Sequence, residues 1–163
     1  IRRARERVLY DRFLAALRGG EHVSQAALFP VQVNVGVENR LIFDDHAEML
    51  SSLGFDIAPF GNDTIVVNGM PEGFQVDQSS VESAMADVLI ILSESGTGLQ
   101  EMMESSMAEK FARMAAAGCK DIETSAEASS LIDSLYSSSN PEFTPGGRRT
   151  MRLLTSADIE KMI

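Results

Sequence analysis

The spacing of the apolar residues changes along this chain, and this change constrains the fold more than any other feature of the sequence. Valines alternate with polar residues over 31–35, directly after Pro30, which predicts a half-buried β-strand beginning at that proline. Two further β-like runs, 55–60 and 64–68, are joined by Gly-Asn-Asp, a sequence typical of a hairpin turn. The first half of the chain therefore contributes strands to a sheet.

Helical spacing dominates most of the remaining sequence. Apolar residues at helical intervals predict helices over 1–17 and 41–53, each followed by glycine. Three capping boxes predict the starts of three more helices, because the two side chains of a box satisfy backbone amides of the first turn. The boxes are Ser79/Glu82, Thr97/Gln100 and Thr124/Glu127. Towards the end we expect a strand over 149–154 and a short helix near Ser156.

This order of elements predicts an α+β fold. Segments that contain strands stand at both ends of the chain, and a helical segment stands between them. We therefore predict a discontinuous subdomain of sheet and helix over 1–72 and 140–163, with an inserted helical subdomain over 73–139. A chain of 163 residues is long enough for one core with a smaller satellite.

Composition narrows the class of protein. The single cysteine, Cys119, allows no internal disulfide and favours a reducing compartment. No apolar run approaches the roughly 20 residues that cross a bilayer, and the first residues lack the apolar core of a signal peptide, so we expect no membrane segment. A net charge of −10 argues against binding nucleic acid over the whole surface, because such binding requires cations along the phosphates.

Basic residues are nevertheless concentrated at the start of the chain. Six of the fourteen lysines and arginines are arginines within the first 18 residues. Any contact with DNA is therefore expected to be local, with Arg2, Arg3 and Arg5 as the candidates. The alternative is that these arginines form a solvated helix face.

The most specific short motif is Gln-Ala-Ala-Leu-Phe-Pro at 25–30. It resembles the motif by which bacterial replication and repair proteins bind the sliding clamp. Leu28 and Phe29 would enter a pocket of the partner, and Gln25 would fix the orientation of the extended segment that ends at Pro30. The alternative is that the apolar pair belongs to the core, as at many strand starts.

Five weak motifs in register resemble one family. Their order and spacing are those of the C-terminal domain of MutL, the mismatch-repair family, over nearly the whole chain. The motifs are Arg5–Phe13, Gln25–Pro30, Leu53-Gly54-Phe55 with Phe60-Gly61, Asn140-Pro141, and Pro145-x-Gly147-Arg148.

The resemblance implies a domain that joins two copies of a bacterial mismatch-repair matchmaker and binds the sliding clamp. It implies that the ATPase lies in N-terminal domains outside this chain and that this domain needs no cofactor. MutS and DNA would be partners of the full-length protein, in the cytoplasm at the nucleoid. In the family, two strands of the same sheet precede the first helix, so we expect them before residue 1.

Many members of the family are metal-dependent nicking endonucleases, and the resemblance places their acidic ligands at Glu6 and Asp11. Arg2 stands where the histidine of the first motif belongs, and a permanent cation cannot coordinate metal. Near the C-terminus, Thr144 and Gly146 replace a cysteine and a histidine. We therefore predict no metal site and no catalytic residue, with Glu6 and Asp11 as charges on the helix surface.

Two alternatives remain at this stage. One is a divergent nicking endonuclease that uses Glu6 and Asp11, which would require metal-ligand residues around them in space. The other is an interaction domain unrelated to repair, which burial of 25–30 in the core would favour. A further acidic cluster, at 44–48 with His46, is interpreted as a solvated helix face.

Overall fold

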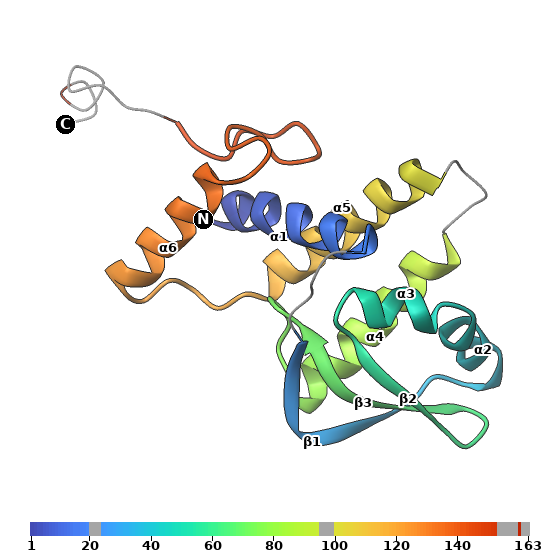
Figure 1. Ribbon diagram of the computed structural model, residues 1–163. Coiled ribbons are helices and arrows are strands. Elements are labelled where there is room, and N and C mark those ends of the chain that lie inside the picture. Colours follow the sequence, from blue (N-terminus) through green and yellow to red (C-terminus); the bar gives the residue numbers. More distant parts are fainter. Residues whose placement is uncertain (20–23, 95–99, 153–159, 161–163) are drawn as a thin grey trace.

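The computed structural model describes residues 1–19, 24–94, 100–152 and 160, and Figure 1 shows an α+β architecture, as predicted. The elements, in chain order, are α1 (Arg2–Leu17), β1 (Ser24–Asn34), α2 (Val37–Asp45), α3 (Ala47–Ser52), β2 (Asp56–Phe60), β3 (Thr64–Pro71), α4 (Gln78–Ser93), α5 (Gln100–Gly118) and α6 (Ser125–Tyr136).

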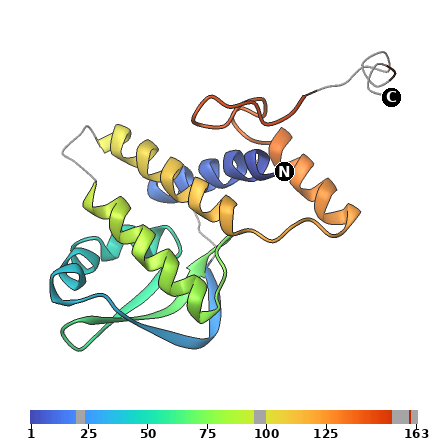
Figure 2. The same cartoon turned by 180° about the vertical axis from the view of Figure 1, so that it is seen from behind.

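The three strands form an antiparallel sheet in the order β1-β3-β2. The hairpin predicted from the Gly-Asn-Asp sequence joins β2 to β3, with Gly61 at a φ of 65°. Val33 of β1 pairs with Ile65 of β3, and both side chains are buried on the same face of the sheet. Helix α4 lies across one face of this sheet, as Figure 2 shows from behind.

The helices form a second layer that is joined to the sheet by aromatic contacts. Helix α1 packs along α5 (Figure 1), where the Phe13 and Phe111 ring centroids lie 6.4 Å apart. Phe55, which immediately precedes β2, lies 5.7 Å from Phe111 and 5.4 Å from Phe74. One core cluster therefore includes side chains from both predicted subdomains, and the division at 72 and 140 stays a prediction.

The structure corrects the helix predicted over 41–53. That segment forms α2 and α3, which are separated at His46, where the backbone leaves helical geometry at φ −112° and ψ 12°. The His46 ring contacts the Ile42 carbonyl oxygen through Nδ1 at 2.9 Å, so a local side-chain contact accompanies the break. Gly54, at a φ of 96°, follows α3 as the expected stop.

Two predicted element starts also differ from the structure. The first strand begins at Ser24 and runs through Pro30, because residues 24–26 already pair with β3. Helix α4 is capped by Asp77 instead of Ser79, because the Asp77 carboxylate, two residues earlier, accepts the Ser80 amide at 3.1 Å.

Of the other two boxes, one is confirmed. Thr124 caps α6 and accepts the Glu127 amide at 3.2 Å, while Thr97 lies outside the described residues. The strand predicted over 149–154 is wrong in its described part, where Arg149 only bridges to Phe143. Arg149 therefore pairs with the segment just before it and not with a strand of the sheet. Residues 153–154 and the helix predicted near Ser156 lie outside the described residues.

Within the described residues, no helix combines the length and the apolar character required to cross a membrane.

Candidate functional site

The carboxylate of Glu6 is almost completely buried, with only 1% of the residue exposed. Nη2 of Arg148 donates to both of its oxygens, at 3.0 and 2.7 Å, and Nε of Arg113 lies 3.9 Å from Oε1. The prediction that Glu6 is a helix-surface charge is therefore wrong. Two guanidinium groups from distant parts of the chain cover it and supply the opposite charge that burial of a carboxylate requires.

A short loop aims Arg148 at α1. The Thr144 amide donates to the Arg148 carbonyl oxygen at 2.8 Å, and the Arg148 amide donates to the Thr144 hydroxyl at 3.1 Å. Gly147 adopts a φ of 74° within this turn, a backbone conformation that residues other than glycine rarely adopt. Thr144 is buried, so the hydroxyl at this position holds the loop closed.

Hydrogen bonds from an ion pair within α1 hold the same segment against this helix. Arg7 is buried, and its Nε donates to the Phe143 carbonyl oxygen at 2.8 Å while Nη1 donates to Asp11 at 3.2 Å. Asp11 accepts the amide and the hydroxyl of Ser139 at 2.6 and 2.9 Å. Arg7 is thus not part of a solvated face, and the partly exposed Asp11 has a bonding role as well as a surface position.

The side chains around Glu6 are cations and not metal ligands. Within the described ranges, no group of three or more histidine, cysteine, aspartate or glutamate side chains is close enough to hold a metal ion. In the acidic cluster at 44–48, Asp44 pairs with Arg40 and the carboxylates are exposed, in agreement with a solvated face.

The segment 25–30 is extended and exposed at the edge of the sheet, as the docking interpretation requires. Leu28 is 92% exposed and Phe29 is 82% exposed. Between the paired residues Ala26 and Val31 the register with β3 shifts, so four residues of β1 lie opposite one residue of β3. This bulge lifts the apolar pair away from the sheet, and the interpretation that required burial of 25–30 loses its support.

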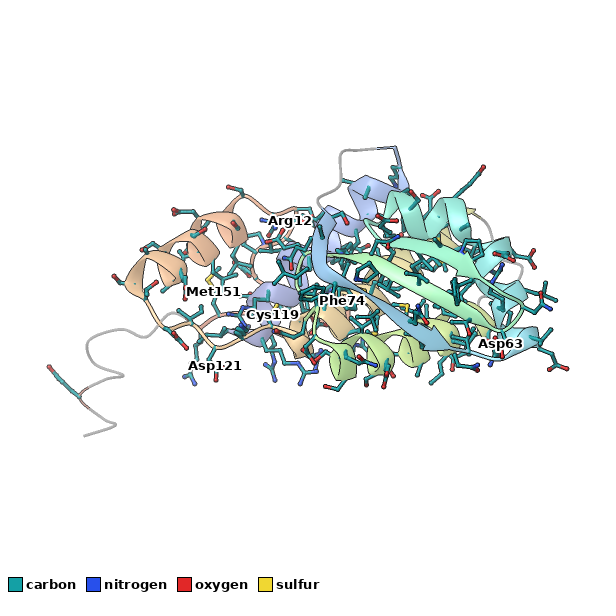
Figure 3. The ribbon with its side chains drawn as sticks, turned by 90° about the horizontal axis from the view of Figure 1, so that it is seen from below. Arg12, Asp63, Phe74, Cys119, Asp121 and Met151 are labelled. Atoms are coloured by element: carbon teal, nitrogen blue, oxygen red, sulfur yellow. The ribbon has the colours of Figure 1, made fainter. Side chains whose placement is uncertain are left out.

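Gln25 and Arg5 border a cavity of about 670 Å³ between α1, α6 and the segment after α5. Figure 3 labels four other residues of its lining: Arg12, Phe74, Cys119 and Asp121. Burial raises the pKa of the Cys119 thiol. The Arg5 charge lowers this pKa and the Glu72 charge raises it, and both effects are smaller than that of burial. A neutral thiol at this position is a poor nucleophile at neutral pH.

Comparison with known proteins identifies the family. The family model described as the MutL C terminal dimerisation domain matches residues 1–122. The chain belongs to this family.

Three MutL relatives, all described as DNA mismatch repair protein MutL, illustrate the match. The proteins of Phocaeicola vulgatus and Parabacteroides distasonis are both 30% identical to this chain, and that of Bacteroides fragilis is 28% identical. Each alignment covers 98% of this chain and 25%, 26% and 25% of the relative, respectively. The chain therefore spans about a quarter of the length of these MutL proteins.

Membership of the MutL family confirms the resemblance drawn from the five motifs, but the motifs did not reveal the ionic cluster. Glu6 lies inside the matched family region and Arg148 lies beyond it. Sequence reasoning missed the pairings of Arg113 and Arg148 with Glu6. One sequence feature could have pointed to these pairings. Thr144 and Gly146 replace metal-ligand residues, so this loop has a role other than metal binding, and in the structure it positions Arg148 against Glu6.

Arg2, Arg3 and Arg5 occupy different surroundings in this MutL domain. Arg2 and Arg3 are exposed, and Nη1 of Arg3 donates to the Arg149 carbonyl oxygen at 3.1 Å. Arg5 is partly buried at the cavity with Cys119. The three candidate DNA contacts are therefore not equivalent.

Proposed function

We propose that this chain is the homodimerisation domain of a MutL-type mismatch-repair protein, that it recruits the sliding clamp through 25–30, and that it does not itself nick DNA. The observation that carries the clamp proposal is the exposure of Leu28 and Phe29 on an extended edge segment. The family match supports the dimerisation proposal.

The exposed apolar pair suits a short docking contact. Leu28 and Phe29 project from a bulge next to Pro30, so a partner can enclose both side chains without unfolding the sheet. Gln25 pairs through its backbone with Met70, which leaves its amide on a defined strand position four residues before Phe29. Two apolar anchors and one oriented amide form a small interface, so we expect modest affinity.

Surface plasmon resonance on immobilised bacterial sliding clamp tests this. Leu28→Ala with Phe29→Ala is expected to weaken binding by at least about tenfold, because truncation of a central anchor commonly costs more than 1 kcal/mol. Phe60→Ala, which truncates a 54% exposed apolar residue at the end of β2, is the matched control and is expected to bind as the unmodified chain does. Equal binding by the double variant and this control would contradict the docking proposal.

The chemistry around Glu6 supports the proposal that this domain is not a nuclease. Arg113 and Arg148 occupy the space beside the carboxylate, and their permanent positive charge opposes binding of a divalent cation there. We expect no nicking of supercoiled plasmid with manganese or magnesium and no stoichiometric zinc in the purified protein. Nicking that is abolished by Glu6→Gln would establish the alternative, a divergent endonuclease.

Dimerisation is tested by light scattering at micromolar concentration, where the mass is expected to be twice that of one chain. A mass of one chain would contradict the proposal. In the longer protein this dimer would hold together N-terminal ATPase domains that act with MutS on DNA, in the bacterial cytoplasm at the nucleoid. No cofactor is required by this domain for that role.

A further inference from the structure

The cavity that Cys119 lines is a candidate binding site apart from the ionic cluster at Glu6. Its volume of about 670 Å³ lies within the range of small-molecule sites, roughly 300 to 1,000 Å³. Four parts of the chain line it: α1, the segment 72–76 between β3 and α4, the segment 119–122 between α5 and α6, and α6 itself. We call it the α1–α6 cavity.

The inner wall of this cavity is apolar and is held by packing. Val8 and Leu9 of α1 and Phe74 are buried, and Leu131 of α6 packs, partly buried, against the small cluster that contains Val8. Gln75 joins two of the lining segments, because its Nε2 donates to the Gly118 carbonyl oxygen at 2.8 Å. A wall that is formed in advance in this way suits the hydrocarbon part of a ligand.

Arg5 supplies a half-buried positive charge beside this wall. Among the described residues, no carboxylate pairs with it. Its charge also acts on the Cys119 thiol of the same lining, whose pKa it lowers against the larger effect of burial. A half-buried guanidinium without a partner favours an anion that accepts its hydrogen bonds.

The other charges of the cavity restrict which anion fits. Three cations and three carboxylates belong to its described lining, so the cavity as a whole does not attract a polyanion. Arg12 pairs with Glu72, and Glu127 accepts a backbone amide before α6 at 3.0 Å. Lys120 and Asp121, adjacent and exposed, bring opposite charges to the rim. The ligand is therefore expected to carry a single anionic group that reaches Arg5.

We propose that the α1–α6 cavity binds a small organic carboxylate with an apolar body, the chemistry of a medium-chain fatty acid. The Arg5 guanidinium donates to the carboxylate oxygens, in the paired geometry that these two planar groups favour. The hydrocarbon body contacts Val8, Leu9 and Leu131. This binding goes beyond the proposed function, because it requires neither the dimer nor the sliding clamp.

Calorimetric titration of the full chain with octanoate tests the proposal. Arg5→Gln is expected to weaken binding about tenfold, because hydrogen bonds between charged groups are stronger than those between neutral groups. The matched control, Arg2→Gln, makes the same charge change at an exposed position of the same helix outside the cavity, and its affinity is expected to stay within about twofold. Octan-1-ol has the same body without the carboxylate, so it should bind more weakly than octanoate and should not distinguish Arg5→Gln from the unmodified chain.

Cys119 reports whether octanoate binds at this place, since it is the single thiol of the chain. Saturating octanoate is expected to slow alkylation of Cys119 by iodoacetamide at mildly alkaline pH, and the same concentration should protect Arg5→Gln less. Ser130→Phe narrows the cavity from α6 and keeps every charge, so it should also weaken octanoate binding. Urea denaturation checks that each variant is folded.

Four results would overturn the proposal: no octanoate binding by the unmodified chain, equal affinities for octanoate and octan-1-ol, equal losses in Arg5→Gln and Arg2→Gln, or alkylation of Cys119 that octanoate does not slow. If Arg5→Gln fails to fold, Ser130→Phe decides. Weaker octanoate binding by Ser130→Phe supports the site, and unchanged binding overturns it.

Discussion

The exposed fractions of Glu6 and of the pair Leu28–Phe29 are the reverse of what their residue types predict. The carboxylate is 1% exposed, whereas the two large apolar side chains are 92% and 82% exposed. Glu6 is buried because Arg148, from the other end of the chain, binds both of its oxygens. Leu28 and Phe29 are exposed because a bulge separates them from their sheet neighbours. At both positions, burial depends on whether the fold brings a partner to the side chain, and not on the residue type alone.

The largest expected effect comes from breaking the ionic cluster. Arg148→Met leaves the buried Glu6 carboxylate with only the longer contact to Arg113, and we expect the free energy of unfolding to fall by about 3 kcal/mol. Urea denaturation of the two proteins measures the difference.

The double variant Glu6→Met, Arg148→Met provides the control for this prediction. It removes both charges, so most of the lost stability is expected to return. A loss below about 0.5 kcal/mol for Arg148→Met alone, the range of ordinary surface changes, would place the pair among weak surface contacts and would break the comparison.

A smaller effect is expected at Asp77, an exposed carboxylate that contrasts with Glu6. The Ser80 hydroxyl, the Ser80 amide and the Ser79 hydroxyl lower the pKa of Asp77 from 3.8 to about 2. A lowered folded-state pKa means that this contribution is present above the unfolded value and is lost as pH falls from 3.8 towards about 2. Asp77→Ala should therefore lower Tm at neutral pH, and its difference from the unmodified chain should shrink across that acid range.

Thermal unfolding followed by circular dichroism at neutral and acidic pH measures this difference. Asp77→Ser keeps a capping hydroxyl without the charge, so its Tm difference from the unmodified chain should depend on pH as that of Asp77→Ala does, from a smaller starting value. A pH-independent difference for Asp77→Ala would show that the carboxylate charge contributes nothing to the α4 cap.

The smallest effect on stability is expected for the exposed pair. Leu28→Ala with Phe29→Ala should change the free energy of unfolding by less than about 0.5 kcal/mol, because both side chains already contact solvent. Val33→Ala, in the same strand but 8% exposed, should cost about 2 kcal/mol. Similar losses for the two variants in urea denaturation would mean that the pair belongs to the core.

Several elements could be predicted because their signals are local. The Gly-Asn-Asp turn specified the hairpin, and Thr124 with Glu127 specified the start of α6, since each depends on residues within a few positions. Asp77 took the place of Ser79 at α4 because two capping side chains compete within one turn. The break at His46 was not predicted, since the apolar stripe continues across it.

The sequence by itself determined the α+β class, most helices and strands, and the family, because periodicity, turn residues and short motifs act over short distances. Only the tertiary structure decided the surroundings of Glu6 and the contact between Arg3 and the backbone of Arg149. Arg148 stands 142 positions from Glu6, and Arg3 stands 146 positions from Arg149. No local pattern encodes such pairings, because they depend on how α1, α5 and the segment after α6 pack together.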